Sequence, residues 1–257
     1  MKHPLRTLLL AVCCGLAAAC TQRQERLKLM SYNIRNGIGI DNIQDIDRIA
    51  RVILREAPDL VALQELDSAT LRVDGRYIPG ELGRMTGMHA TFGRAIGFAG
   101  GSYGIGLLSR TEPLAVRSIP LPGREEARVL LMAEFPDYTV CVTHLSLTPE
   151  DRHASLPLIL QATDTCRKPV LLAGDFNTGN AAAVLAGLGG GFRILSDTTR
   201  MTFPSDNPAV RIDYILGRGL PTSATVAESA VDHTATASDH CPLWVTLVWK
   251  RGKQPGK

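Results

Sequence analysis

The sequence is poor in aromatic residues, in excess charge of one sign and in cysteines spaced as Cys-x-x-Cys. Aromatic side chains make up 5% of the chain, and no long apolar insertion follows residue 19, which argues against a membrane-engaging hairpin. The formal net charge is only +3, so a strong basic field for capturing polyanions is absent. No Cys-x-x-Cys spacing indicates zinc or redox chemistry. With 45% apolar residues and no internal repeat or linker, the composition favours one domain with a substantial core.

The first 19 residues predict an export signal. A short basic region, residues 1–6, precedes an apolar run over residues 7–19 that ends in small residues, as a cleavage site does. That run is too short for a membrane span, which needs roughly 20 residues. Residues 16–20 (LAAAC) also resemble a bacterial lipobox, with Cys20 as the lipidated first mature residue and alanine in place of the usual leucine. We expect either an outer-membrane lipoprotein or a periplasmic protein cut near this point.

Removal of the signal leaves a nearly neutral chain with an odd number of cysteines. Without Lys2 and Arg6, the 28 basic residues fall to 26, against 25 acidic ones. The remaining cysteines are Cys141, Cys166 and Cys241, which leaves open one disulfide and one thiol. We expect a single monomeric domain over residues 27–249, with residues 250–257 as a flexible tail.

Short apolar strands outnumber helices in the hydrophobic pattern. Because consecutive strands follow one another without helices, we predict two packed, mixed and mostly antiparallel sheets with helices outside, a four-layer α/β sandwich. The expected strands are 27–34, 60–66, 89–93, 105–109, 128–135, 139–145, 170–173, 211–216 and 242–249, and the expected helices are 45–56, 79–86, 150–165 and 181–188.

Polar side chains gather where the predicted strands end. Each of them alone has an ordinary interpretation as a solvated cap, a hydrogen-bonding partner or a turn residue. Burying several at once is costly unless they pair or bind a cation. The residues are Asn33, Glu65, His144 and Asp175, and Asp213 is a more specific signal because it interrupts an apolar strand.

The tripeptide Ser238-Asp239-His240 adds an acid next to a histidine. One of these side chains can hold a divalent cation while the other takes a proton from water, as hydrolysis of a phosphate ester requires. The pattern therefore points to metal-dependent phosphoester chemistry.

Several segments in order resemble the endonuclease/exonuclease/phosphatase family, which includes deoxyribonucleases, bacterial sphingomyelinases, inositol polyphosphate 5-phosphatases and abasic-site endonucleases. The resemblance spans the mature chain and implies a four-layer α/β sandwich. The segments are 31–35 (SYNIR), 63–66 (LQEL), 103–109 (YGIGLLS), 143–146 (THLS), 174–177 (GDFN), 211–215 (RIDYI) and 238–240 (SDH).

The resemblance implies a role for each matching residue. Glu65 would be the principal Mg²⁺ ligand, assisted by Asn33 and Asp239, with Mn²⁺ or Ca²⁺ as alternative ions. His240 would be the general base, oriented by Asp213. The remaining implied catalytic residues are Asp175 and Asn177, which would position the nucleophile or complete a second metal site, and His144, which would protonate the leaving oxygen or stabilise the transition state.

Two positions, His144 and Ile105, help to decide which branch of the family the chain resembles. The histidine at position 144 resembles the deoxyribonuclease, sphingomyelinase and inositol phosphatase branches, whereas the abasic-site endonucleases carry no histidine in that segment. Ile105 departs from the family, which usually has asparagine or glutamate two places after the tyrosine, and this puts the orientation of His144 in doubt. Tyr103, Arg35 and Arg128 are candidate substrate contacts, with packed aromatic and surface arginines as the alternative interpretations.

The expected function is hydrolysis of a phosphodiester or phosphomonoester bond by metal- and histidine-activated water. The substrate stays open among nucleic acid, nucleotide and lipid head group. Near-neutral charge argues against a nuclease groove, and the missing apolar hairpin argues against a sphingomyelinase. An exported phospholipid phosphodiesterase is the alternative, and a non-catalytic binding protein is disfavoured because the metal ligand and the base are both present.

Overall fold

The computed structural model describes residues 24–250 of the chain. The expected export signal, Cys20 and residues 251–257 lie outside the described residues. Lys250, expected at the start of a flexible tail, is instead the last residue of a strand. Within residues 24–250, no helix is long and apolar enough to cross a membrane.

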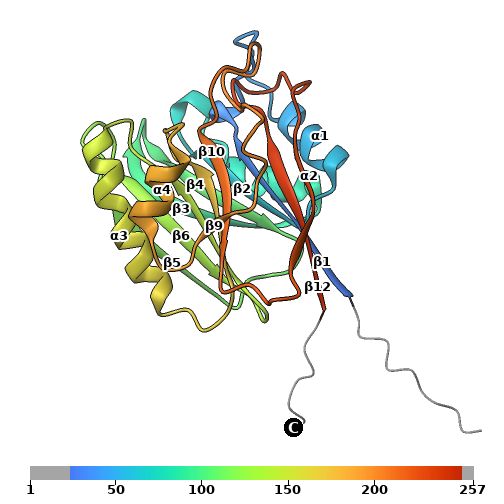
Figure 1. Cartoon of the computed structure of the whole chain (residues 1–257). Coiled ribbons are helices and arrows are strands. Elements are labelled where there is room, and N and C mark those ends of the chain that lie inside the picture. The colour runs from blue at the N-terminus through green and yellow to red at the C-terminus, as the bar shows by residue number, and fades with distance from the viewer. Residues whose placement is uncertain (1–23, 251–257) are drawn as a thin grey trace, which may run out of the picture.

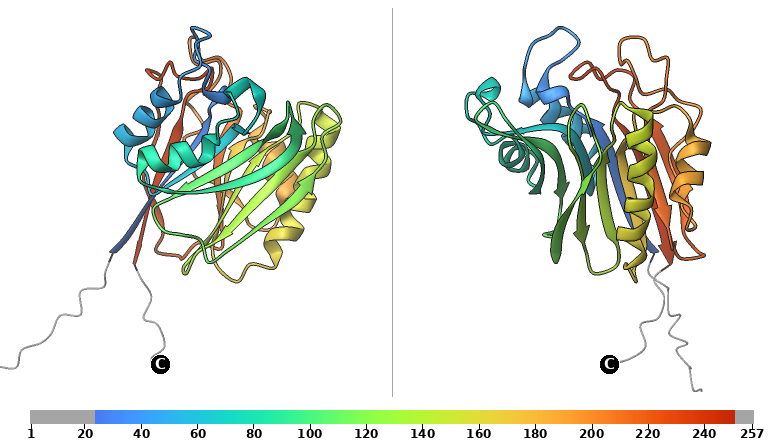
Figure 2. Two further views of the ribbon diagram at one scale, coloured as in Figure 1. Left: turned by 180° about the vertical axis from the view of Figure 1, so that it is seen from behind. Right: turned by 90° about the vertical axis from the view of Figure 1, so that its left-hand side faces the viewer.

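Two six-stranded sheets pack face to face with helices on both outer sides (Figures 1 and 2). The predicted four-layer α/β sandwich is therefore confirmed. The first sheet has the order β11 (Thr225–Val231), β12 (Leu243–Lys250), β1 (Gln24–Asn33), β2 (Leu60–Ser68), β4 (Gly101–Ser109) and β3 (His89–Phe98). The second has the order β5 (Ala115–Leu121), β6 (Arg128–Glu134), β7 (Thr139–His144), β8 (Val170–Asp175), β10 (Asp213–Arg218) and β9 (Arg193–Ile194).

Pairing in both sheets is mostly antiparallel, as predicted. Among the strands of residues 24–250, the parallel pairs are β1 with β2 and β7 with β8. At the opposite end of β1 from Asn33, Gln24 lies beside Lys250 of β12. The first and last described residues thus sit side by side at one end of the sandwich (Figure 1).

The helices cover the outer faces of the sheets. On the first sheet, α1 (Ile46–Glu56) and α2 (Ile78–Thr86) pack against β1 and β2 in one apolar cluster. On the second, α3 (Pro149–Asp164) and α4 (Ala181–Leu188) pack against β7 and β8 in another. Two short 3₁₀ helices, Arg35–Gly37 and Leu71–Val73, lie in connections of the first sheet.

The helix predicted over residues 45–56 is confirmed as α1, and its buried face explains the apolar pattern in the sequence. Ile46, Ile49 and Ile53 recur at helical spacing and are buried against the first sheet. Asp45 caps the start, since its Oδ1 accepts a hydrogen bond from the Arg48 N–H at 3.2 Å. The helix ends at the left-handed Ala57, directly before Pro58.

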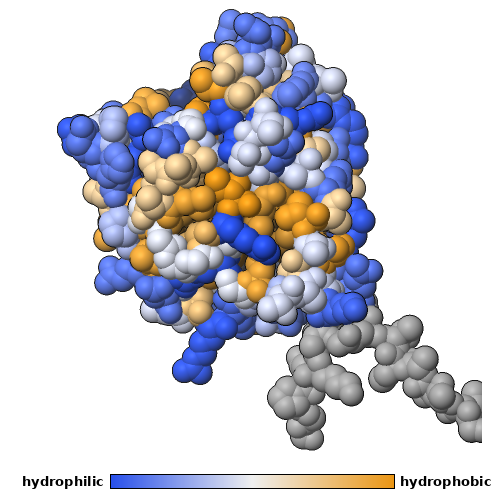
Figure 3. All heavy atoms as spheres, viewed as in Figure 1, coloured by the Kyte–Doolittle hydropathy of each residue, from blue (hydrophilic) through white to orange (hydrophobic). Residues whose placement is uncertain are grey.

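Three strands were missed from the sequence. β5 and β11 are edge strands whose side chains are mostly exposed, so they lack the apolar alternation that predicts a strand. β9 is only two residues long. On the face viewed in Figure 3, apolar side chains gather in the middle, over β9, β10 and β12.

Candidate active site

Strand register brings the second sheet's candidate residues to one end of the sandwich. His144 ends β7 and lies beside Asp175, which ends the parallel strand β8. Asp213 begins β10 and lies opposite Asp175 in the antiparallel pair. Asp213 was predicted inside a strand over 211–216, but the strand begins at Asp213 itself, so the aspartate lies at the start of the strand rather than interrupting it.

The first sheet reaches the same place through a bulge. The strand predicted to end at Leu66 continues to Ser68, and its register shifts between Leu63 and Leu66. Glu65 sits in this bulge with a positive φ of 57°. The Asn33 Nδ2 donates to Glu65 Oε1 at 3.0 Å and to Asp175 Oδ2 at 3.2 Å, so one amide joins the two sheets.

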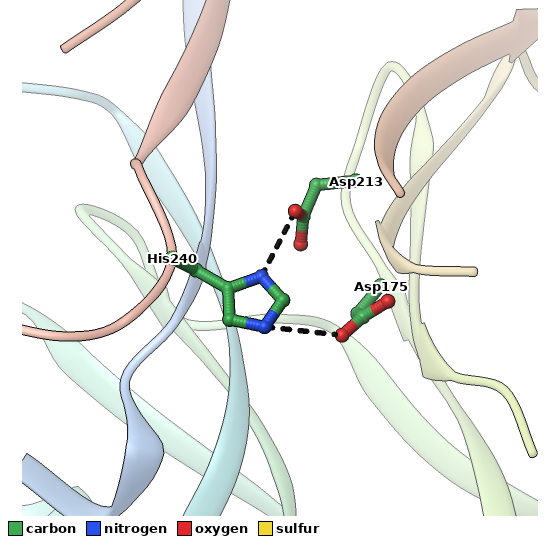
Figure 4. A group of neighbouring side chains, drawn as sticks. All are labelled: Asp175, Asp213 and His240. Atoms are coloured by element: carbon green, nitrogen blue, oxygen red, sulfur yellow. Dashed lines mark hydrogen bonds and ion pairs between the residues drawn. The ribbon is translucent and has the colours of Figure 1, made fainter. Parts of the chain in front are cut away.

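His240 lies between two buried carboxylates (Figure 4). Its Nδ1 is 3.0 Å from Asp213 Oδ2, and its Nε2 is 3.7 Å from Asp175 Oδ2. Burial lowers the pKa of His240, but the charge of Asp213 and its hydrogen bond outweigh this and raise the pKa to about 10. Because Asp213 accepts the proton of Nδ1, the Nε2 is the atom that can exchange a proton with a reacting group.

The carboxylates around His240 have raised proton affinities as well. Burial, and next the charge of Asp213, raise the pKa of Asp175 to about 7. Burial also raises the pKa of Glu65, against the opposing effect of its bond from Asn33. Both shifts arise mainly from burial, which disfavours the charged form of each carboxyl group.

Asp239 and Arg35 face one another at the edge of the site. Arg35 Nε is 3.5 Å from Asp239 Oδ2, with about a third of each side chain exposed at 35% and 31%. Arg35, predicted to contact substrate, therefore pairs with a predicted metal ligand. The charge of Asp239 acts on Glu65, since it raises the pKa of that carboxyl group.

His144 is held from the side opposite Asp175. Its Nε2 is 3.6 Å from Asp175 Oδ2, and its Nδ1 is 3.3 Å from Nη1 of Arg128. Burial, then the charges of Arg128 and His240, lower the pKa of His144 well below its ordinary value. The ring is therefore neutral in the metal-free protein.

Asn177 and Tyr103 occupy different parts of the predicted site. The Asn177 N–H donates to Asp175 Oδ1 at 2.8 Å, and its side-chain amide donates to the Leu145 carbonyl at 2.8 Å, so Asn177 braces Asp175. Tyr103 is buried and lines a small cavity with Arg128 and His144. The Arg72 guanidinium lies over its ring at 5.1 Å, which is the packed-aromatic arrangement.

The loop that clamps the Ser238-Asp239-His240 segment could not be predicted from its residues. Ser205 donates from its N–H to the Asp239 carbonyl and from its hydroxyl to the Ser238 carbonyl, each at 2.7 Å. The ring of Phe203 packs on the His240 imidazole with centroids 4.8 Å apart. This loop, residues 197–212, has no apolar periodicity that would predict a helix or strand, so its contacts depend on tertiary structure.

The residues present suit a divalent cation. Asp213 Oδ1 is buried and has no hydrogen-bond partner among the described residues. A buried carboxylate oxygen without a partner is uncommon. Asp175, Asp213 and His240 place ligand atoms within 4.8 Å of one another. Of these three residues, Asp213 and His240 already contact each other. Glu65 and Asp239, by contrast, are half-buried carboxylates that are partly exposed to solvent. Oxygen donors of this kind are what a hard cation such as Mg²⁺ prefers.

Cys141, Cys166 and Cys241 are all free thiols, so the disulfide left open by the sequence is not formed between them. Cys141 and Cys241 are buried in the apolar core. Burial raises the pKa of the Cys241 thiol to about 12. These cysteines therefore behave as small apolar residues.

Comparison with known proteins gives one family. The profile of the endonuclease/exonuclease/phosphatase family matches residues 30–240. No curated protein matches the chain.

Solved structures share the fold at low identity. An endonuclease/exonuclease/phosphatase family protein from Bacteroides thetaiotaomicron is 20% identical, with 89% of this chain and 100% of that chain covered and a TM-score of 0.72. A mannosyl-6-phosphatase from the same organism is 19% identical, with 86% and 99% covered and a TM-score of 0.68. D. rerio TDP2 complexed with a single-strand DNA product is 23% identical, with 86% and 98% covered and a TM-score of 0.66.

Proposed function

This chain belongs to the endonuclease/exonuclease/phosphatase family, and from that premise we propose that it is an exported, Mg²⁺-dependent phosphodiesterase. One observation carries the proposal: His240 lies between Asp213 and Asp175, and Asn33 joins that group to Glu65. This arrangement combines an oriented proton acceptor with adjacent oxygen ligands, the two parts that hydrolysis of a phosphate ester needs.

The metal-binding residues in this proposal are Glu65, Asn33 and Asp239. When bound, the cation supplies positive charge that neutralises developing charge on the phosphoryl oxygens and favours the neutral form of His240. Glu65 and Asp239 are partly open to solvent, so an ion can reach them without opening the core.

The proton is handled by His240 and its partners. Its Nε2 takes a proton from the attacking water, while Asp213 holds Nδ1–H at 3.0 Å and stabilises the resulting imidazolium. Asp175, braced by the Asn177 N–H, orients the water beside Nε2. His144 faces the same carboxylate from the other side and stabilises charge on the phosphoryl group.

The substrate proposal is a phosphodiester, with an exported phospholipid phosphodiesterase as the alternative. A histidine at 144 supports the branch that resembles deoxyribonucleases and sphingomyelinases. The structural neighbours include both a mannosyl-6-phosphatase and TDP2 complexed with a single-strand DNA product, so the fold alone does not select one class of substrate. Export rests on the signal-like residues 1–19, and lipid attachment at Cys20 would place the enzyme at the outer membrane.

The first test is metal-dependent turnover of a simple aryl phosphodiester. We expect hydrolysis with Mg²⁺, none after chelation, and recovery when Mg²⁺ is restored. Glu65→Gln and His240→Asn should each abolish most of the activity. Equal turnover with and without chelator, or in both variants, would contradict the mechanism.

The second test compares substrates under the same conditions. The panel contains DNA, RNA, sphingomyelin vesicles, phosphoinositides and aryl phosphomonoesters. A preference for DNA that falls steeply with salt would favour a nuclease, and activity confined to vesicles would favour the phospholipid alternative.

A further inference from the structure

Arg128 contacts the His144 ring at the nitrogen that faces away from the centre of the site. The distance from its Nη1 to His144 Nδ1 is 3.3 Å, and both side chains are buried, with 6% and 8% exposed. Ile105 lines the same small cavity and belongs to the apolar core between the sheets, so it offers His144 neither a donor nor an acceptor. Arg128 is thus the polar partner that the structure gives to Nδ1.

Two glutamates fix the guanidinium that faces His144. Arg128 Nη1 donates to Glu126 Oε1 at 2.9 Å, and Nη2 donates to Glu125 Oε1 at 3.4 Å. Glu125 itself accepts from the Ser146 hydroxyl at 2.7 Å and from the Leu147 N–H at 2.7 Å, just after His144 in the chain. The guanidinium is therefore tied to the segment that carries the histidine it contacts.

The chemistry of the two groups decides where the His144 proton lies. A guanidinium has five N–H donors and no acceptor. A proton on Nδ1 would set two donors against each other at 3.3 Å, so Nδ1 must accept. The proton then resides on Nε2, which faces Asp175 Oδ2 at 3.6 Å.

We propose that Arg128 is a positioning residue that holds His144 as the tautomer with its proton on Nε2. His144 then presents a fixed hydrogen-bond donor toward the space beside Asp175. Its function in catalysis is donation to a phosphoryl oxygen, not transfer of a proton to the leaving group, and this catalytic part rests on the proposed function. A carboxylate in place of Ile105 would act in the opposite way, since an acceptor at Nδ1 draws the proton there.

The tautomer can be read directly by long-range ¹H–¹⁵N NMR of the full chain labelled in histidine. The His144 signals are assigned by their loss in His144→Gln. We expect Nδ1 without a proton and Nε2 with one in the wild type. The comparison uses Arg128→Met, which removes the donor, Arg128→Lys, which keeps one, and Arg128→Met with Ile105→Glu, which substitutes an acceptor. Arg124→Met is the matched control, because Arg124 lies just before β6, is itself exposed, and pairs with Asp151 rather than with His144.

Arg128→Met should average the two nitrogen shifts, Arg128→Lys and Arg124→Met should retain the wild-type pattern, and the double variant should move the proton to Nδ1. Arg128→Met should also lower kcat roughly 10- to 100-fold with a smaller change in KM. A wild-type spectrum with the proton on Nδ1, or an unchanged tautomer in Arg128→Met, would overturn the proposal. The spectra require no turnover, so loss of the proposed function on every substrate would leave this result standing and separate the two failures.

Discussion

The two sheets contribute side chains of different accessibility to one site. On the first sheet's side, Glu65 and Asp239 are half-buried. On the second sheet, Asp175 and Asp213 are almost completely buried, with 1% exposed in each case. The difference separates two tasks: an accessible face can exchange an ion with solvent, whereas a buried face fixes the positions of protons in a medium where charges interact strongly. His240 lies where the two faces meet.

The largest effect is expected at that junction. His240→Asn keeps a polar side chain but removes the proton acceptor, and we expect kcat/KM for an aryl phosphodiester to fall by about 10³-fold. His233→Asn is the control, since His233 is exposed and its Nε2 contacts the Met201 carbonyl rather than the site. Comparable losses in the two variants would mean that the junction has no special role.

Glu65→Gln separates the two faces most clearly. It preserves shape but removes a charged ligand from the accessible face, so the Mg²⁺ concentration for half-maximal activity should rise by more than about 100-fold. Asp213→Asn, on the buried face, should lower kcat while leaving that concentration within a few-fold of wild type. Titrations of activity with Mg²⁺ check both, and a similar shift in metal requirement for the two variants would break the distinction.

The buried face should also give the metal-free protein a pH-dependent stability. The pKa of Asp175 is raised from 3.8 to about 7, so between these values the folded state holds a proton that the unfolded state has lost, and the free energy of unfolding falls as pH rises. His240, raised from 6.5 to about 10, acts in the same direction: its contribution is complete below pH 6.5 and is lost as pH rises through about 10.

Asp175→Asn removes one of these charges. In the presence of chelator it should flatten the decline between pH 4 and 7 and stabilise the protein by roughly 2 kcal/mol above pH 7. Urea unfolding at several pH values measures this. A variant that is less stable than wild type at pH 8 would show that Asp175 is not under electrostatic strain.

The smallest effect on stability is expected at Glu125, which contacts Arg128 and Ser146 beside the buried face. Burial raises the pKa of Glu125, but hydrogen bonds from Ser146, Leu147 and Thr148 outweigh this and lower it to about 2. Glu125→Gln should therefore cost about 1 kcal/mol at pH 7, with the difference from wild type shrinking as pH falls from 4.5 towards 2. Chemical denaturation at pH 7 and pH 3 measures it, and an equal loss at both values would contradict the assignment.

The layered fold was predictable because buried elements carry strong patterns. β1, β2, β7 and β8 are apolar runs that end in a polar residue, and α1 has apolar residues at helical spacing with a capping aspartate. The same physics concealed β5 and β11, whose exposed edge positions impose no apolar pattern. The local sequence pattern indicates which residues are buried, and few residues of these two strands are buried.

Within the site, the residue types were readable but their partners were not. Asn33, Glu65, Asp175, Asp213 and His240 were predicted as candidates from strand ends and short motifs, and their gathering depends on register. The bulge at Glu65, the contact of Arg128 with His144 and the clamp from Ser205 to Asp239 each join segments far apart in the chain. Such contacts have no local signature in the sequence. The orientation of His144, which the motif with Ile105 left open, therefore depends on its contact with Arg128 in the folded chain.

The pairing of Gln24 with Lys250 places both ends of the described chain at the same end of the sandwich, where any attachment would be made. β1 runs from Gln24 to Asn33, so its ends are about 30 Å apart at the usual rise per residue, with the candidate site residues at the Asn33 end. A linker, a bead or a fused domain joined at either end of the described chain is directed to the far pole of the sandwich. The end of the sandwich that carries Asn33 and the candidate site then faces away from the point of attachment.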